Sequence, residues 1–136
     1  MVTFSASTGS HALKVLVAED NLINQRLLVA MLGKLGHTGV VVGDGQQALK
    51  CMAQVEFDVV LMDVMMPVMD GLEALSLMRE QERLSGRHLP VIMATAHAEP
   101  GDAQKFAQAG ADGYVSKPID AAALKLELAR VATLRR

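Results

Sequence analysis

The sequence predicts an α/β protein with a doubly wound, five-stranded parallel sheet and helices on both faces. Short apolar runs alternate along the chain with longer segments in which apolar residues recur at helical spacing. The short runs are apolar almost throughout, which is typical of parallel strands buried on both faces. Right-handed crossovers between such strands place helices on the two sides of the sheet.

The expected strands are the short runs that are rich in valine, isoleucine and other apolar residues. Each is four or five residues long, and each is followed by polar or loop-forming residues. Strands of this length are ordinary in globular domains. They are Lys14–Ala18, Thr38–Val42, Asp58–Met62, Pro90–Ala94 and Gly113–Ser116.

The expected helices lie between and after these strands. The first shows the clearest apolar stripe, and two later segments repeat the pattern, whereas the segments Gln46–Ala53 and Asp102–Ala109 are shorter and weaker. The stripe residues are Ile23, Leu27, Leu28, Met31, Leu32 and Leu35 in the first helix, Leu72, Leu75 and Met78 in the third, and Leu124, Leu128 and Val131 in the last.

Composition places the chain among ordinary globular proteins. Its 136 residues are 51% hydrophobic and 21% charged, with a net charge of −2, which suits one domain with a substantial core. We expect residues 1–12, which are rich in Ser, Thr and small residues, to be a flexible leader or linker, and residues 13–136 to be the domain. Cys51 is the only cysteine, so we interpret it as a small buried hydrophobe.

The same composition argues against several partners and locations. Aromatic residues are 3% of the chain and no basic patch is visible, so direct nucleic-acid binding is not expected. No apolar run approaches the roughly 18 residues that a membrane span needs. We therefore expect a cytoplasmic domain without membrane contact of its own, tethered to the membrane only if the full-length protein is a membrane-bound sensor.

Polar side chains follow the expected strands at one edge of the sheet, where the functional crevice of such sheets lies. Glu19 and Asp20 follow the first strand, Asp63 the third, Thr95 the fourth and Lys117 the fifth. Carboxylates brought this close repel one another unless a cation relieves them. Mg²⁺ prefers oxygen ligands and leaves positions for phosphate oxygens, so the cluster predicts Mg²⁺-dependent phosphoryl transfer.

Three motifs carry a resemblance to a known family. They are Leu16–Asn21 (LVAEDN), Met62–Gly71 (MDVMMPVMDG) and Gly110–Pro118 (GADGYVSKP), in that order. Together with Thr95, they are similar to the signatures of response-regulator receiver domains, over about Lys14 to Leu134. The Asn24-Gln25 pair after the first motif most resembles the receivers of hybrid sensor histidine kinases. The resemblance implies a flavodoxin-like (βα)5 fold with strand order 2-1-3-4-5.

The resemblance also implies roles for individual residues. Asp63 would be the phosphoacceptor and Lys117 the cation that binds the phosphoryl group. Mg²⁺ would be held by Asp63, by Asp20 directly, by Glu19 through a water, and by the backbone carbonyl of Met65. The remaining implications are Thr95 as the switch hydroxyl, Tyr114 as the aromatic switch, and a cis Lys117–Pro118 peptide.

Other residues have more ordinary interpretations. Asn21 is expected to cap the first helix, and Asp70 and Gly71 to form the loop before the third helix rather than to take part in catalysis. His97 lies near the expected pocket and is either an influence on water access or a solvated loop residue. The nine methionines are expected to fill the core.

Several functions compete with phosphoryl acceptance in signalling. A phosphatase of the aspartyl-phosphate type would need a second acid at the position of Met65. A flavodoxin would need a phosphate loop without the acidic Glu19-Asp20 pair. A degenerate receiver would have lost a chemical group, and none is missing. The receiver could belong to a hybrid kinase or stand alone as a single-domain response regulator.

A phosphohistidine donor on a histidine kinase or a histidine phosphotransfer domain is the expected partner. Its histidine must reach Asp63, so docking should surround the strand-end crevice. Ile23, Leu27 and Leu28 cannot all face the core, and the first helix, from Leu22 to Leu35, can therefore offer an apolar patch to a helical partner.

Overall fold

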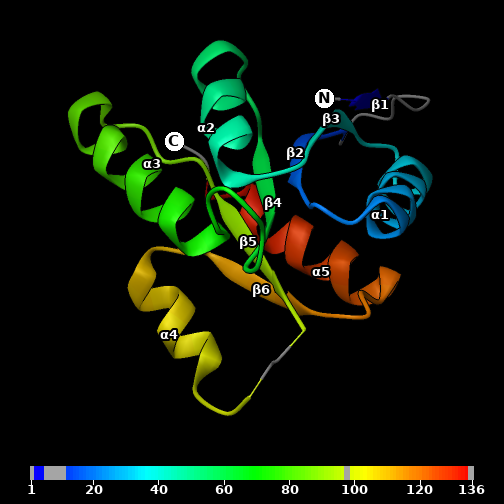
Figure 1. The fold of residues 1–136 in the computed structure, drawn as a ribbon. Coiled ribbons are helices and arrows are strands. Elements are labelled where there is room, and N and C mark those ends of the chain that lie inside the picture. Colours follow the sequence, from blue (N-terminus) through cyan, green and yellow to red (C-terminus); the bar gives the residue numbers. More distant parts are fainter. Residues whose placement is uncertain (1, 5–11, 97–98, 135–136) are drawn as a thin grey trace.

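The computed structural model describes residues 2–4, 12–96 and 99–134 and shows a sheet covered by helices on both sides (Figure 1). The strands are β1 (Val2–Phe4), β2 (Lys14–Ala18), β3 (Thr38–Val42), β4 (Val59–Asp63), β5 (Val91–Thr95) and β6 (Gly113–Ser116). The helices are α1 (Leu22–Lys34), α2 (Gly45–Gln54), α3 (Gly71–Ser85), α4 (Asp102–Ala109) and α5 (Ala121–Ala132).

The sheet confirms the predicted fold class and strand order. Its strands lie in the order β1-β3-β2-β4-β5-β6, and the five from β3 to β6 are parallel. Without β1 this is the expected order 2-1-3-4-5. The carboxyl ends of β2 and β4 therefore lie side by side at the centre of the sheet, flanked by those of β3 and β5.

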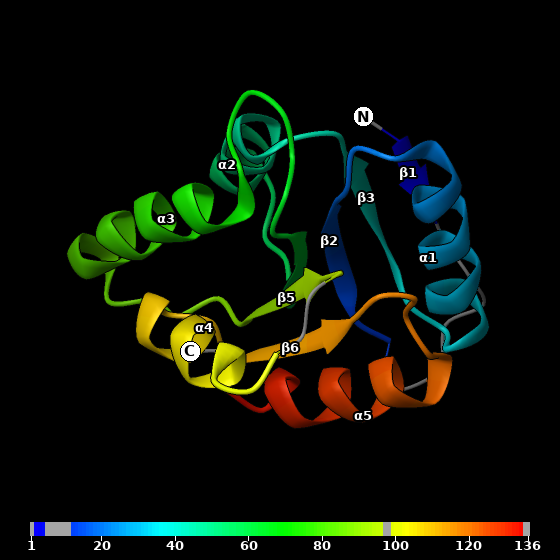
Figure 2. The ribbon, with the colours of Figure 1, turned by 60° about the horizontal axis from the view of Figure 1, so that its bottom comes forward.

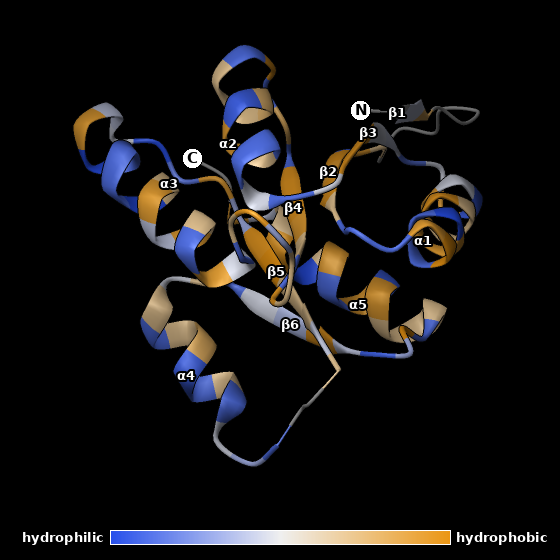
Figure 3. Ribbon diagram, in the orientation of Figure 1, coloured by the Kyte–Doolittle hydropathy of each residue, from blue (hydrophilic) through white to orange (hydrophobic). Residues whose placement is uncertain are grey.

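The core forms two apolar layers of side chains, one on each face of the sheet. Figure 2 shows the helices that cover the two faces, and Figure 3 shows that the central strands are hydrophobic. Side chains of β2 and β4 alternate between the layers, as the two-residue period of a strand requires. Leu16 faces α2, α3 and α4, whereas Val15 and Val17 face α1 and α5. Cys51 is buried in the first layer, as predicted. The residues that α5 contributes to the second layer are the predicted Leu124, Leu128 and Val131.

Two strand boundaries differ from those predicted. β4 and β5 begin and end one residue later than the runs Asp58–Met62 and Pro90–Ala94, so Asp63 and Thr95 are the last strand residues. Backbone pairing causes the shift, because Asp63 pairs with Ala94 and Thr95 with Ser116. Both polar side chains are thereby held by the sheet rather than by a loop.

The edge of the sheet carries a strand that the sequence did not predict. β1 pairs antiparallel with β3, with Phe4 opposite Gly39, and the Phe4 side chain packs against the core layer under α1 and α5. Residues 1–12 were predicted as a leader because three strand residues show no recognisable period. Residues 5–11 of that leader lie outside the described residues.

The apolar stripe predicted for α1 is only partly in the core. Leu28 and Leu32 are buried, but Ile23 is 69% exposed and Leu27 is 53% exposed. Ile23 lies five residues before Leu28, which turns it by about 140° around a helix of 3.6 residues per turn. A helix packed on one face of a sheet cannot bury both positions.

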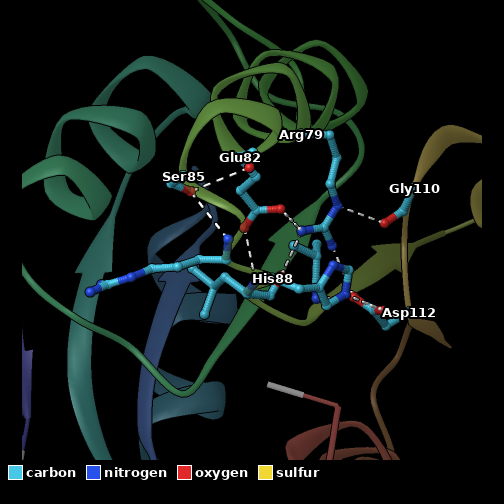
Figure 4. A network of polar contacts seen from close by, with 9 residues as sticks. Arg79, Glu82, Ser85, His88, Gly110 and Asp112 are labelled. Atoms are coloured by element: carbon cyan, nitrogen blue, oxygen red, sulfur yellow. Dashed lines mark hydrogen bonds and ion pairs between the residues drawn. The ribbon is translucent and has the colours of Figure 1, made fainter. Parts of the chain in front are cut away.

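A polar network at the edge of the sheet opposite the strand ends joins α3 to the start of β6 (Figure 4). The Asp112 carboxylate accepts hydrogen bonds from the Arg79 guanidinium at 2.9 Å and from the Val91 backbone N–H at 2.9 Å, and it contacts His88 Nε2 at 2.8 Å. Arg79 also donates to the backbone carbonyl of Gly110 at 2.9 Å. The network therefore fixes where β6 begins, and β6 leads to Lys117.

We predict that Asp112→Ala lowers the free energy of unfolding by about 2–4 kcal/mol, because it removes the carboxylate paired with Arg79 Nη2 and leaves the Val91 N–H without its acceptor. The matched control is Arg87→Ala, which removes an exposed ion pair to Glu56 and should cost about 0–1 kcal/mol. Urea denaturation of both variants measures the difference. Equal losses for the two variants would contradict this account of the network.

Candidate functional site

Acidic side chains from two neighbouring strand ends meet at one edge of the sheet. Glu19 and Asp20 follow β2, and Asp63 ends β4. Their carboxylate oxygens lie within 4.8 Å of one another. Glu19 is 1% exposed and Asp63 is 6% exposed, whereas Asp20 faces solvent. The cluster is therefore closed on the protein side and open on the side of Asp20.

Lys117 provides the positive charge in this cluster. Its Nζ donates to Glu19 Oε1 at 2.7 Å and to Asp63 Oδ2 at 2.9 Å. The Lys117 backbone N–H also donates to the Thr95 carbonyl at 2.7 Å, which continues the β5–β6 pairing past the strand ends. Asp63, Thr95 and Lys117 are thus brought together, as the sequence predicted for strand-end residues.

Burial alone would lower the pKa of Lys117, but the hydrogen bonds and charges of Asp63 and Glu19 outweigh it and raise the pKa above its usual value. Lys117 is therefore cationic throughout the neutral range. The cluster contains three carboxylates and one ammonium group, which contacts two of them, so it keeps a local excess of negative charge. Such an excess favours a further cation.

The loop after β2 is shaped by Asn21. Its side chain accepts a hydrogen bond from the Asn24 N–H at 3.0 Å, which confirms the predicted helix cap. Its own N–H donates to Glu19 Oε2 at 3.0 Å. The same residue therefore starts α1 and fixes the second carboxylate oxygen of Glu19.

The loop between β4 and α3 folds back so that its end lies against the backbone of Asp63. Asp70 caps α3 by accepting from the Glu73 N–H at 2.8 Å, which confirms its predicted loop role. The Gly71 N–H donates to the Val64 carbonyl at 2.9 Å. A Cβ on Gly71 would lie 2.0 Å from the Asp63 carbonyl oxygen, so only glycine fits here. The motif contains this glycine, but the close approach is visible only in the structure.

The same loop contains a strained turn. Val68 has a φ of 67°, and the Met69 N–H donates to the Pro67 carbonyl at 2.7 Å. A hydrogen bond between residues two apart, with positive φ at the centre, defines the less common form of γ-turn. Positive φ is costly for a β-branched residue. The loop after Asp63 therefore holds backbone strain beside the acidic cluster.

The other residues for which the sequence predicted a role differ in their burial. Thr95 is buried at the end of β5, and the Met65 N–H faces Asp63 Oδ1 at 3.4 Å while its side chain is exposed. Tyr114 lies on β6 with its ring partly exposed and 6.1 Å from the ring of Phe106. Lys117–Pro118 is cis. His97 lies outside the described residues.

The donor set of the cluster fits a hard divalent cation. Across residues 2–4, 12–96 and 99–134, Glu19, Asp20 and Asp63 are the one group of acidic, histidine or cysteine ligands close enough to share an ion. All their donor atoms are carboxylate oxygens, the type that Mg²⁺ prefers over the nitrogen and sulfur ligands of zinc. The exposed side at Asp20 leaves room for the waters that Mg²⁺ retains.

Comparison with known families identifies the class of protein. Residues 15–129 match the family described as "Response regulator receiver domain". The chain therefore belongs to this family, as the three motifs predicted. Receiver domains are phosphoacceptor modules of two-component signalling and not classical enzymes.

Proteins of two kinds are similar in sequence to this chain. Hybrid signal transduction histidine kinase I of Dictyostelium discoideum is 46% identical over 112 residues, which cover 79% of this chain and 6% of that kinase. The polar-differentiation response regulator DivK of Brucella ovis is 35% identical over 105 residues, covering 77% of this chain and 84% of DivK. The chain thus spans a small part of the kinase but most of the regulator.

Solved structures of receiver domains share the fold. The receiver domain of the sensor histidine kinase PA1611 from Pseudomonas aeruginosa, solved with a magnesium ion in its active-site cleft, matches with a TM-score of 0.79 and 37% identity over 90% of this chain and 98% of that one. The receiver domain of Ssk1 from Saccharomyces cerevisiae, solved with the histidine phosphotransfer protein Ypd1, matches with a TM-score of 0.76 and 28% identity over 90% and 86%.

The helices in the part of the chain that the structure describes are α1 to α5. None of them is long and apolar enough to cross a bilayer.

We predict that Gly71→Ala destabilises the protein by about 1–3 kcal/mol and displaces the Asp63 backbone, because the new methyl group overlaps the Asp63 carbonyl. Gly33→Ala is the control, since a Cβ at Gly33 meets nothing within 4 Å and alanine favours the helix by up to about 1 kcal/mol. Urea midpoints and the amide NMR shift of Asp63 report both effects. An unchanged Asp63 shift and full stability in Gly71→Ala would refute the steric argument.

Proposed function

We propose that this domain accepts a phosphoryl group from a phosphohistidine onto the carboxylate of Asp63, in the presence of Mg²⁺, and passes the signal to a partner protein. The observation that carries the proposal is the setting of Asp63. It is buried at a strand end, paired with Lys117 at 2.9 Å, and within 4.8 Å of two further carboxylates. No ordinary structural role requires three carboxylates this close together.

In the proposed reaction a carboxylate oxygen of Asp63 attacks the phosphorus atom of the phosphohistidine. The new P–O bond forms as the P–N bond breaks, and the ring, protonated from solvent on its other nitrogen, leaves as neutral imidazole. Phosphoryl transfer of this kind depends on positioning and on neutralising oxygen charge. Lys117 is suited to hold one phosphoryl oxygen, since its ammonium group already contacts Asp63 Oδ2. The same groups support slow hydrolysis of the acyl phosphate by the domain itself.

Asp20 and Asp63 would hold Mg²⁺ directly, with Glu19 acting through a water and the Met65 carbonyl as a further ligand. When bound, the ion would neutralise charge on the phosphoryl oxygens together with Lys117. Glu19 suits an indirect role because its oxygens already accept from Lys117 at 2.7 Å and from Asn21 at 3.0 Å. Asp20 is the exposed member of the cluster and suits direct ligation.

The proposed switch involves Thr95 and Tyr114. A phosphoryl group on Asp63 adds about −1.5 to −2 charges and new acceptor oxygens. Thr95 and Lys117 would each donate to them, and two charge-assisted contacts of about 1.5–3 kcal/mol approach the about 5.5 kcal/mol needed to invert a 1:99 equilibrium. The partly exposed Tyr114 would then turn inward beside Phe106 and change the surface of α4, β6 and α5.

A hybrid histidine kinase is the proposed parent protein. The identity of 46% to a hybrid kinase, over a small part of that kinase, supports this assignment. A stand-alone response regulator is the second candidate, because DivK is matched over 84% of its length. In both cases we propose that the domain lies in the cytoplasm. As part of a hybrid kinase, it would be tethered to a sensor in the membrane.

The proposed partner is a histidine kinase or a histidine phosphotransfer domain, as in the structure of Ssk1 with Ypd1. Exposed apolar side chains border the acidic cluster on two sides. Leu22, Ile23 and Leu27 lie on α1, and Met65 and Val68 lie on the loop after β4. Exposed apolar residues on these two segments suit a helix that carries the phosphohistidine over Asp63.

We expect the wild-type protein, incubated with a small-molecule phosphodonor, to gain one phosphoryl group in the presence of Mg²⁺ and none after chelation. Asp63→Asn should gain none, because the amide is not a nucleophile, while Asp70→Asn, which changes a helix cap, should be labelled as the wild type is. Intact-mass analysis gives the answer. Labelling of Asp63→Asn, or labelling indifferent to Mg²⁺, would rule the proposal out.

For the docking surface, Ile23→Glu should weaken binding of a histidine phosphotransfer domain at least about tenfold, since a charge would enter an apolar contact. Leu84→Glu is the control, because Leu84 is exposed at the end of α3, away from the strand ends. Calorimetry measures both affinities, and NMR shift perturbation maps the contact. Perturbations that avoid α1 and the loops after Asp63 and Lys117 would contradict the proposed geometry.

A further inference from the structure

Gln25, in the second turn of α1, makes a polar contact that the proposed function has not used. Its side-chain amide nitrogen Nε2 donates to the backbone carbonyl of Glu19 at 2.6 Å. The side chain is half-buried. A carbonyl oxygen only accepts hydrogen bonds, so the NH₂ end of the amide must face Glu19. This contact joins the body of α1 to the peptide between Glu19 and Asp20.

The backbone on either side of Asp20 is also held. The Glu19 N–H donates to the Val42 carbonyl at 3.0 Å, and the Gln25 N–H donates to the Asn21 carbonyl at 2.9 Å. The Asn21 N–H donates to Glu19 Oε2 at 3.0 Å. Glu19 is therefore fixed at its N–H, its side chain and, through Gln25, its carbonyl.

Asp20 differs from its neighbours in this respect. Its exposed carboxylate accepts no hydrogen bond or ion pair from the residues that the structure describes, whereas Glu19 and Asp63 are both paired with Lys117. Within the described part of the chain, the backbone is consequently what positions the Asp20 side chain, by setting its Cα–Cβ bond. The peptide that precedes it is the one whose carbonyl Gln25 holds.

We infer that Gln25 is a positioning residue for the cation site: by fixing the Glu19–Asp20 peptide, it holds the Asp20 carboxylate near Asp63 before Mg²⁺ arrives. This inference rests on the proposed function, because it assigns Asp20 as a direct ligand. Ligands held in place by outer hydrogen bonds bind metals more tightly, since less ordering is left to the binding step.

A purely structural role is the alternative, because any hydrogen bond from a helix to the preceding loop adds some stability. The chain supplies a matched comparison in α2. Gln47, in the first turn of that helix, accepts a hydrogen bond from the Gly43 N–H at 3.1 Å with its side-chain oxygen. It joins helix and loop as Gln25 does, but none of the cluster carboxylates lies on that loop.

The test compares Mg²⁺ binding by the wild type, Gln25→Met and Gln47→Met. Methionine keeps the length of the side chain and a good helix propensity, but it cannot donate as Gln25 does and is only a weak acceptor in place of Gln47. Titration with Mg²⁺, followed by amide NMR shifts, gives each dissociation constant without any phosphorylation. We expect the constant of Gln25→Met to rise about tenfold, in line with other outer-sphere losses, and that of Gln47→Met to stay at the wild-type value.

Phosphorylation rates complete the test. At saturating Mg²⁺ the rate of Gln25→Met should return to the wild-type rate, because Asp63 and Lys117 are untouched. Equal dissociation constants for Gln25→Met and wild type, or equal weakening in the two methionine variants, would overturn the inference. A wild-type protein that binds no Mg²⁺ would instead overturn the proposed function. Should Gln25→Met fail to fold, Gln25→Ala in the same titration removes the donor with a smaller side chain.

Discussion

The ion pairs of Lys117 with Glu19 and Asp63 hold together strand ends that would otherwise repel one another. The ammonium group lies 2.7 Å from one carboxylate and 2.9 Å from the other, and both carboxylates are almost completely buried. Two ionised carboxylates in such a setting are tolerable only with a cation beside them. The fold supplies that cation from β6, three strands away from β2 in the sheet.

This arrangement makes the position of β6 critical, and the structure fixes the strand at both ends. At its start, Asp112 is bound to Arg79 of α3 and to the backbone of Val91, with α5 adding a contact from Arg130 to the Asp112 carbonyl at 2.6 Å. At its end, Lys117 closes the acidic cluster. Between these two polar anchors β6 pairs with β5 through the backbone, from Gly113 opposite Ile92 to Ser116 opposite Thr95, so the anchors reinforce a register that the sheet already sets.

Most of the fold was predictable from the sequence, and so were the strand-end residues. Strands buried on both faces are recognisable in the sequence as continuous apolar runs. Because the strands are parallel, the polar residues at their carboxyl ends lie at the same edge of the sheet. The predicted strand bounds were wrong where they depend on contacts between segments that are distant in the sequence, and the strand β1 was missed. The strand ends at Asp63 and Thr95 depend on pairing with neighbouring strands, and β1 is too short to show a period.

The sequence also could not assign the two sides of α1 or the contacts that support the cluster. Ile23 and Leu27 are as apolar as Leu28, and only the placement of the helix on the sheet distinguishes them. Gln25 was visible as part of a motif, but its contact with the Glu19 carbonyl depends on the angle between α1 and β2. The closeness of Gly71 to the Asp63 carbonyl is likewise a three-dimensional fact.

We propose that the carboxylate of Asp63 carries the phosphoryl group, and the most direct measurement locates that group chemically. An acyl phosphate is a mixed anhydride, so borohydride reduces it to an alcohol, whereas phosphate esters of serine and threonine are unaffected. Reduction of the phosphorylated protein, followed by peptide mass spectrometry, should reveal the alcohol at Asp63 and at no other carboxylate. A phosphate that survives reduction on Thr95 or Ser116, or an alcohol at Glu19 or Asp20, would contradict the account.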